Sequence, residues 1–413
     1  MPQGGGGRHG CMKEDSPPAT RRRYDGAPPH RTLPFPDIAP VASEKQKQQP
    51  VESMSIPEGP LVEILSRVPY KSLCRFKCVS KPWFALCSDR EILKKSPQSL
   101  AGFFLNFGGN ICVRNLSGRG PPLVDLNLQF LRENYKRVWL EQCCGGLLLC
   151  DCAKSRSLGG GGGGGHDYVV CNPATKEWTV LPHIQFLVQG IVNVGPLIYL
   201  GFDAAVPSRF VAFALSAPEA PNHGQVSIYS SETGRWTSVQ SKWASGTTVN
   251  RHAGYVFLNG AMHLTTFSNS IVTVDAEGKV WREIEMPDDL PTLFTHYSIG
   301  QSQGLLYAWR IENVDDYQLY IWVLEDYING KWALKHTMSV LKLFTRHHKG
   351  YSYSYTMFAV HPDCNVIFVT NKQKLIMSYN MDNQKVRVFS TSTQSRFGLP
   401  YIPCFAEWPS AGQ

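Results

Sequence analysis

The sequence has neither a long apolar run nor much charge. Of its 413 residues, 43% are apolar and 18% are charged, which is typical of a globular protein. A membrane-spanning helix needs about 18 or more consecutive apolar residues, and no segment approaches that length. No apolar segment follows the basic residues near the N-terminus, so no signal peptide is predicted. We therefore expect a protein that contacts no membrane and works in the cytoplasm, the nucleus or both.

The 12 cysteines lack any regular framework spacing, and without a secretory signal they are predicted to be reduced thiols. Five of them and one histidine gather near the middle of the chain: Cys143, Cys144, Cys150, Cys152, Cys171 and His166. A zinc site favours paired C-x2-4-C spacings. Cys150 and Cys152 would instead share one face of a strand, which suits a tetrahedral site poorly. We predict buried free thiols and no bound metal or other cofactor.

Motifs for hydrolytic chemistry are scarce as well. The chain contains no H-E-x-x-H and no P-loop, and nothing in it singles out a Cys–His nucleophile pair. The net charge of +8 is concentrated at the N-terminal end, because residues 97–413 hold 25 Lys and Arg against 23 Asp and Glu. A nearly neutral region is a poor partner for phosphates, so we expect no nucleic-acid binding there.

Residues 1–55 are poor in apolar side chains and rich in Pro, Gly, Arg and Gln, with a run at Gly4–Gly7. Such a segment cannot offset the entropy lost on ordering, and it is predicted to be a disordered tail. The triplet Arg21–Arg23 could be a nuclear localisation signal, or its charges could simply be solvated.

Residues 56–96 are predicted to form three short helices. In the first, apolar residues recur at helical spacing: Leu61, Ile64, Leu65 and Val68. Pro57 and Pro60 stand at its entry, and Pro69 prevents its continuation. The second carries Leu73, Phe76 and Val79, and the third begins at the N-cap residue Ser80, followed by Trp83, Leu86 and Cys87. A segment of about forty residues cannot bury three apolar stripes in a core of its own. We therefore expect part of this apolar surface to be buried elsewhere, as in a docking module.

These residues recur at the spacing of the F-box, which the stretch resembles. F-boxes bind the Skp adaptor of SCF ubiquitin ligases. The resemblance implies adaptor contacts at Pro57, Leu61, Ile64, Leu65, Val68, Pro69, Leu73, Phe76, Val79, Ser80, Trp83 and Leu86. Gly59 and Pro60 depart from the usual acidic residue and Leu, and Ser88–Glu91 departs from the usual Asp-Pro-aromatic end. The alternative is a small helical bundle packed on the following domain.

From about residue 100 the helical pattern gives way to short β-rich runs separated by Gly, Pro, Asn and Asp. A unit of strands, a polar hairpin and an aromatic residue repeats, with tryptophans spaced 45–60 residues apart at Trp178, Trp236, Trp281 and Trp332. This period predicts a kelch-like β-propeller of about five to six blades over residues 100–408. Strand 101–107 and the tail 401–408 could complete the last blade. A pair of β-sandwiches is the alternative.

The β-rich region resembles the F-box-associated propeller domain of plant F-box proteins, on the signature Asn-Pro-x-Thr-x-x-Trp at Asn172–Trp178. The run Gly159–Gly165 is expected to be a flexible hairpin tip. Strand alternation would place Tyr351, Tyr353 and Tyr355 on one face. That face either packs between blades or, if exposed beside Arg346, binds a target protein.

The two resemblances together imply a non-catalytic substrate receptor of an SCF-type E3 ligase. Its partners would be a Skp-type adaptor, through it the cullin and RING subunits, and a target protein held by the propeller for ubiquitination. One alternative is an interaction scaffold whose F-box has eroded. A second is a propeller enzyme, since copper-radical oxidases use a similar fold, but no quartet of one Tyr, one Cys and two His is marked here.

Overall fold

The computed structural model describes the chain from residue 56 to residue 405 with several gaps. The described ranges are 56–96, 98–107, 110–116, 127–154, 166–184, 197–203, 209–215, 224–250, 253–287, 297–312, 316–347, 355–371, 375–390 and 398–405. The predicted tail 1–55, the run Gly159–Gly165 and the side chains of Tyr351 and Tyr353 lie outside these ranges.

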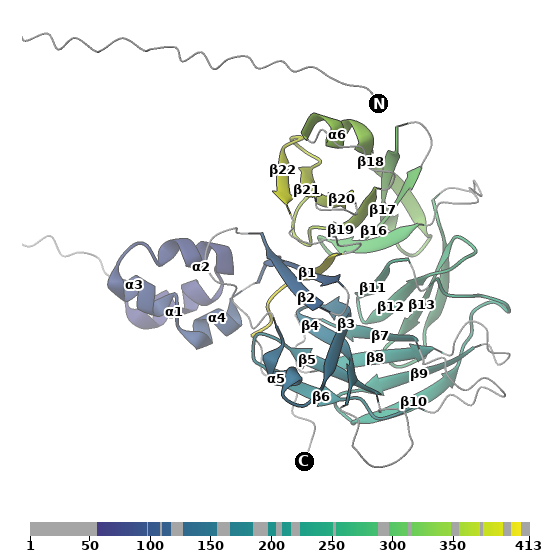
Figure 1. Cartoon of the computed structure of the whole chain (residues 1–413), viewed down its shortest axis with the longest axis horizontal. Helices are drawn as coiled ribbons and strands as arrows, with labels where there is room; N and C mark the ends of the chain where they lie inside the picture. The colour runs from purple at the N-terminus through teal and green to yellow at the C-terminus, as the bar shows by residue number, and fades with distance from the viewer. Residues whose placement is uncertain are drawn as a thin grey trace, which may run out of the picture. The chain divides into compact units, whose positions relative to one another are not determined.

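The first described region is a module of short helices (Figure 1). Its helices are α1 (Glu58–Ser66), α2 (Tyr70–Phe76), α3 (Lys81–Leu86) and α4 (Arg90–Lys95). The first three are the predicted ones, and Ser80 caps α3 by accepting a hydrogen bond from the Trp83 amide at 3.4 Å. Helix α4 was not predicted. Asp89 caps it by accepting from the Glu91 and Ile92 amides at 2.9 and 3.2 Å.

Five four-stranded antiparallel sheets follow, each a meander. Blade 1 consists of β3 (Arg137–Cys144), β4 (Leu147–Ala153), β5 (His166–Asn172) and β6 (Glu177–Val180). Blade 2 consists of β7 (Leu197–Phe202), β8 (Phe210–Leu215), β9 (Gln225–Ser230) and β10 (Arg235–Gln240). Blade 3 consists of β11 (Tyr255–Leu258), β12 (Ala261–Thr265), β13 (Ser270–Asp275) and β14 (Trp281–Glu285).

Blade 4 consists of β15 (Ser298–Ser302), β16 (Leu305–Glu312), β17 (Gln318–Asp326) and β18 (Lys331–Ser339). Blade 5 consists of β19 (Thr356–Val360), β20 (Val366–Thr370), β21 (Leu375–Asn380) and β22 (Val386–Ser390). Two further helices are α5 (Gln129–Arg132), before β3, and α6 (Val340–His347), between β18 and β19.

Blade 6 joins the two ends of the β-rich region. In it β1 (Gly102–Phe107) pairs with β2 (Asn110–Asn115) on one side and with β23 (Gly398–Tyr401) on the other. The register places Gly102 opposite Tyr401 and Leu105 opposite Gly398. The innermost strands are neighbours in the order β23, β3, β7, β11, β15, β19 and again β23. The sheets therefore close into a six-bladed propeller (Figure 1). The predicted closure of first strand on last is confirmed, but the closing strand is Gly398–Tyr401 and not the predicted segment 401–408.

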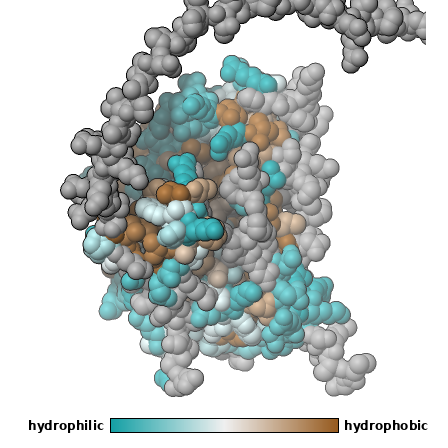
Figure 2. Space-filling view, turned by 90° about the vertical axis from the view of Figure 1, so that its left-hand side faces the viewer, coloured by the Kyte–Doolittle hydropathy of each residue, from teal (hydrophilic) through white to brown (hydrophobic). Residues whose placement is uncertain are grey.

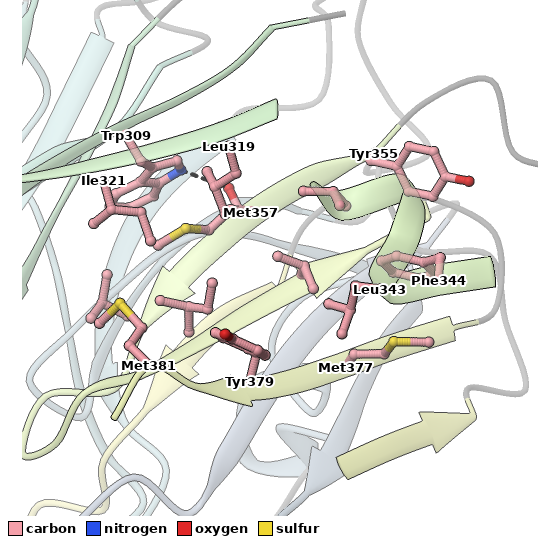
Figure 3. Packing of buried hydrophobic residues seen from close by; sticks show 14 of the residues in the cluster. Trp309, Leu319, Ile321, Leu343, Phe344, Tyr355, Met357, Met377, Tyr379 and Met381 are labelled. Carbon is pink, nitrogen blue, oxygen red and sulfur yellow. Dashed lines mark hydrogen bonds between the residues drawn. The ribbon is translucent and has the colours of Figure 1, made fainter. Parts of the chain in front are cut away.

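The core of the propeller lies between its blades. One apolar cluster fills each of the six interfaces between neighbouring blades. Figure 3 shows the cluster between blades 4 and 5, where the Trp309 indole N–H donates to the Met357 carbonyl at 2.9 Å. Since each sheet buries both faces against its neighbours, strands such as Phe210–Leu215 are buried at every position.

The repeating hairpins explain the sequence repeat. The last residue of the third strand accepts a hydrogen bond from an amide of the following turn in blades 1 to 5: Asn172, Ser230, Asp275, Asp326 and Asn380. The repeated tryptophans lie on the outermost strands β6, β10, β14 and β18. Two of them reach the preceding blade, since Trp236 donates to the Pro182 carbonyl and Trp332 to that of Glu285.

Candidate functional site

The helical module closes a small core of its own. Its buried residues are Leu65, Leu73, Cys87 and Ile92, and around them pack Leu61, Val62, Val68, Phe76, Trp83 and Leu86. The rings of Phe76 and Trp83 meet edge to face, with centroids 5.6 Å apart. The Ser96 hydroxyl donates to the Val68 carbonyl at 2.5 Å and ties the end of α4 to the end of α1. These contacts fix the relative positions of the four helices.

Other apolar side chains of the module remain open. Ile64 is 52% exposed, Val79 63% and Phe84 58%, and Ile56 before α1 is also more than half exposed. Figure 2 views the chain from the side on which Figure 1 draws α1–α4, and apolar surface is visible there among hydrophilic residues. Large apolar side chains on one small module that its own core leaves uncovered are the mark of an interaction surface.

The predicted adaptor contacts fall into three groups. Exposed at the surface are Pro57, Ile64, Pro69, Val79 and Ser80. Partly buried are Leu61, Val68, Phe76, Trp83 and Leu86. Leu65 and Leu73 are enclosed, with at most 1% of either exposed, so they hold the module together and present no side-chain surface to a partner.

Phe84 was missed from the sequence because it stands next to Trp83, off the apolar stripe of the predicted third helix. Adjacent helical residues point about 100° apart, so a side chain beside the stripe faces away from the core. An apolar residue in that position is a usable signal, because polar residues normally occupy the outward face of a small helix.

The departures at Gly59 and Pro60 do not prevent α1 from forming. Both residues are exposed within its first turn, where the helix needs no amide from Pro60. The Leu61 amide donates to the Pro57 carbonyl at 3.1 Å and starts the helical bonding. Space around Gly59 is open, with no atom within 4 Å of where a Cβ would lie.

Basic residues are also exposed on the helical module. Arg75 and Lys81 are exposed in α2 and α3, and residues 56–96 hold eight Lys and Arg against four Asp and Glu. Arg67 is paired with Glu63 at 2.5 Å on one face of α1. The module therefore presents apolar side chains within a positive field, which favours encounter with an acidic partner.

In the propeller, Tyr355 packs in the core between blades. It is 5% exposed, and its ring lies 4.9 Å from those of both Tyr317 and Phe344. Arg346, by contrast, is exposed on α6. Of the four residues considered for target binding, the structure thus places Tyr355 where no partner reaches its ring and leaves Arg346 at the surface.

The cysteine cluster behaves as part of the apolar core. Cys150, Cys152 and Cys171 are fully buried in the cluster between blades 6 and 1, and Cys150 and Cys152 share one face of β4 as predicted. Burial raises the pKa of the Cys143 thiol, and it raises the pKa of Cys144 to about 12. Both thiols are therefore protonated at neutral pH. Among the residues that the structure describes, no three His, Cys, Asp or Glu side chains are grouped as metal ligands.

The pentapeptide Gly300–Gly304 matches the G-x-S-x-G pattern of serine hydrolases in letters only. That motif needs a strand-to-helix turn with an exposed serine. Here it forms the antiparallel hairpin between β15 and β16. Ser302 is fully buried, and its hydroxyl donates to the His361 carbonyl at 2.6 Å.

No helix in the described part of the chain is both long and apolar enough to cross a membrane.

The chain thus consists of a module of four helices with uncovered apolar side chains, followed by a closed propeller. The family model described as "F-box protein At3g26010-like, beta-propeller" matches residues 127–408, and the F-box domain model matches residues 54–95. The chain therefore belongs to the F-box proteins with this propeller.

Two relatives from Arabidopsis thaliana illustrate the family. F-box protein At5g49610 is 28% identical over 306 residues, covering 69% of this chain and 79% of the relative. F-box protein At5g07610 is 26% identical over 305 residues, covering 68% of this chain and 69% of the relative. Among solved structures, an alpha-L-arabinanase of Penicillium chrysogenum complexed with arabinobiose aligns with a TM-score of 0.37 at 11% identity, over 72% of this chain and 87% of that one.

Proposed function

We propose that the chain is the substrate-receptor subunit of an SCF-type ubiquitin ligase. The helical module binds a Skp-type adaptor, which connects it to the cullin and RING subunits. The propeller holds a target protein for ubiquitination. The receptor breaks and forms no bond itself, and it contributes by holding the target's lysines near the conjugating enzyme at high effective concentration. Such a receptor works in the cytoplasm or the nucleus.

One observation carries this proposal: the F-box module leaves Ile64, Val79 and Phe84 more than half exposed although its core is closed around Leu65 and Leu73. Because these three side chains are already partly covered, burying the rest of them against an adaptor would contribute about 1–2 kcal/mol each before the costs of association. The partly buried Trp83 and Leu86 complete the surface, and the basic residues around it suit an acidic adaptor.

The test is co-purification of the full chain with a Skp-type adaptor. Replacing Val79 and Phe84 with Asp should abolish the complex without unfolding the module, because both side chains point away from its core. A matched control replaces Val280 and Ile328, apolar and exposed on propeller hairpins, with Asp. Adaptor binding that survives V79D/F84D, or that is lost equally in the control, would contradict the proposal.

The same experiment separates the receptor from an interaction scaffold with an eroded F-box. A scaffold would fail to bind the adaptor even as the unaltered chain. The third possibility, a propeller enzyme, is tested by metal analysis of the purified protein, where stoichiometric copper would favour it.

A further inference from the structure

Charge is segregated within the nearly neutral propeller region. Residues 327–362 contain no Asp or Glu, but they contain Lys331, Lys335, Lys342, Arg346 and Lys349. The remainder of residues 97–413 therefore holds 20 Lys and Arg against 23 Asp and Glu. The positive stretch covers β18, the outermost strand of blade 4, and α6, which follows it.

Helix α6 turns its cationic residues outward. Val340, Leu343 and Phe344 are buried in the cluster between blades 4 and 5, and Figure 3 shows Leu343 and Phe344 beside Tyr355 in that cluster. Lys342 and Arg346 are exposed and stand four residues apart, so they lie on the same face of the helix. We call this face, defined by Lys342 and Arg346, the α6 surface. Lys335 adds an exposed charge at the β-bulge of β18.

These charges are incompletely neutralised. The Lys342 ammonium pairs with the Asp316 carboxylate at 2.5 Å, and the lysine side chain remains 67% exposed. Within the described part of the chain, neither Arg346 nor Lys335 makes an ion pair. Arg346 also lies in the last turn of α6, where a positive charge stabilises the helix dipole. That purely structural role predicts an effect on stability and none on binding.

We propose that the α6 surface binds an acidic segment of the target protein, in extended conformation with carboxylates at alternate positions. Lys342 and Arg346 are four positions apart in the helix, which places them about 6 Å apart along its axis. In an extended chain, alternate side chains on one face recur every 6.6–6.8 Å, roughly the same distance. The Arg346 guanidinium can donate two parallel hydrogen bonds to one carboxylate of the segment, and the Lys342 ammonium can bind the next carboxylate. This inference rests on the proposed function, because it names the chemistry of the target.

Asp316 gives the proposal a distinctive consequence. The Asp316 carboxylate is already paired with the Lys342 ammonium, so a carboxylate of the target segment must compete with it. The isosteric change Asp316→Asn removes the competitor and leaves the Asp316 carbonyl, which accepts from the Ser339 hydroxyl, unchanged. Acidic peptides should then bind about two- to fivefold more tightly.

The experiment measures fluorescence anisotropy of labelled peptides with the purified full chain. Two short peptides of the same composition carry glutamates at alternate positions in one and at every third position in the other. The alternate peptide should bind more tightly, weaken as salt rises, and lose about tenfold in affinity with K342E/R346E. The matched control K176E/K279E reverses two exposed charges on hairpins of blades 1 and 3, and it should bind as the unaltered chain does.

Equal binding of the two peptides, or no loss with K342E/R346E, overturns the proposal. So does tighter binding of a phosphopeptide or of a single-stranded oligonucleotide that the same variant abolishes. The result is independent of the adaptor test. A chain that binds the adaptor but no acidic peptide refutes this inference alone, and a chain that binds the peptide but no adaptor refutes the ligase assignment alone.

Discussion

The helical module and the propeller bury their apolar residues in different ways. In α1–α4 four side chains are enclosed, while Ile64, Val79 and Phe84 stay more than half exposed. In the propeller every interface between blades has its own apolar cluster, and the ring of blades closes on itself. The module therefore leaves large apolar side chains uncovered beside a small core, whereas the propeller buries its apolar residues mainly between its blades.

This difference shows where each region can gain stability. A small core gives a small free energy of unfolding. A protein that binds only the folded module would raise that free energy with the logarithm of its concentration divided by Kd. The blades of the propeller already pack against one another at every interface, and the charged side chains of the α6 surface lie outside this core.

The largest expected effect is on the free energy of unfolding of the helical module. Leu73→Ala removes a fully buried side chain and should cost about 2–5 kcal/mol. With a core of four enclosed residues, that loss should unfold α1–α4 and leave the blades intact. Hydrogen exchange measured by mass spectrometry would show fast exchange confined to residues 58–95. The control Val79→Ala, at an exposed position, should change exchange little, and equal behaviour of the two variants would remove the distinction between core and surface.

The second test compares how the stability of the two regions depends on pH. The propeller contains a buried histidine, whereas residues 56–96 contain no histidine. His263 is fully buried between the Ala261 carbonyl, which accepts from Nδ1, and the Tyr327 hydroxyl, which donates to Nε2. Burial lowers the pKa of His263 from 6.5 to about 4. The unfolded chain therefore takes up a proton between these values, and propeller stability falls as pH drops through that window.

The pKa difference of His263 corresponds to about 3 kcal/mol in the unfolding free energy. Urea unfolding of the propeller at pH 7 and near pH 4 measures it. His263→Gln removes the titration, so its stability should change less between the two pH values. An unchanged pH dependence in that variant would show that other groups carry it.

The smallest expected effect comes from a glycine-to-alanine substitution made once in each region. Gly59 lies in α1 with open space around it, so Gly59→Ala should stabilise the module by about 0.5–1 kcal/mol. Gly304 also has open space, but its φ is +74°, a conformation that costs an alanine about 1–2 kcal/mol. Opposite signs are expected in thermal unfolding. The same sign at both sites would mean that backbone conformation does not decide the outcome.

Much of the propeller was predictable because its repeat has a physical cause. Each hairpin needs a cap at the end of the third strand, and Asn172, Asp275 and Asn380 supply it at recurring positions. The outer tryptophans recur for a related reason, since Trp236 and Trp332 bind the neighbouring blade. Strand β18 was less visible, because its bulge at Lys335 and its exposed face break the alternation.

The docking surface was predicted only in part. Periodicity places Ile64 and Leu65 on the same apolar stripe, but one is 52% exposed and the other 1%. Which edge of a stripe faces the core depends on where α2–α4 pack, and one helix's sequence does not contain that information. Helix α4 was missed because Asp89 was interpreted as part of an eroded motif end, whereas it caps the helix.

The pairing of β1 with β23 in blade 6 imposes an order on synthesis. As the chain leaves the ribosome, α1–α4 emerge before any strand of the propeller and can fold before the ring is complete. The ring, however, cannot close until Gly398–Tyr401 has emerged, after the strands of all the other blades. A chain truncated before β23 would therefore carry the complete helical module beside an open ring, in which one edge of β1 is left unpaired.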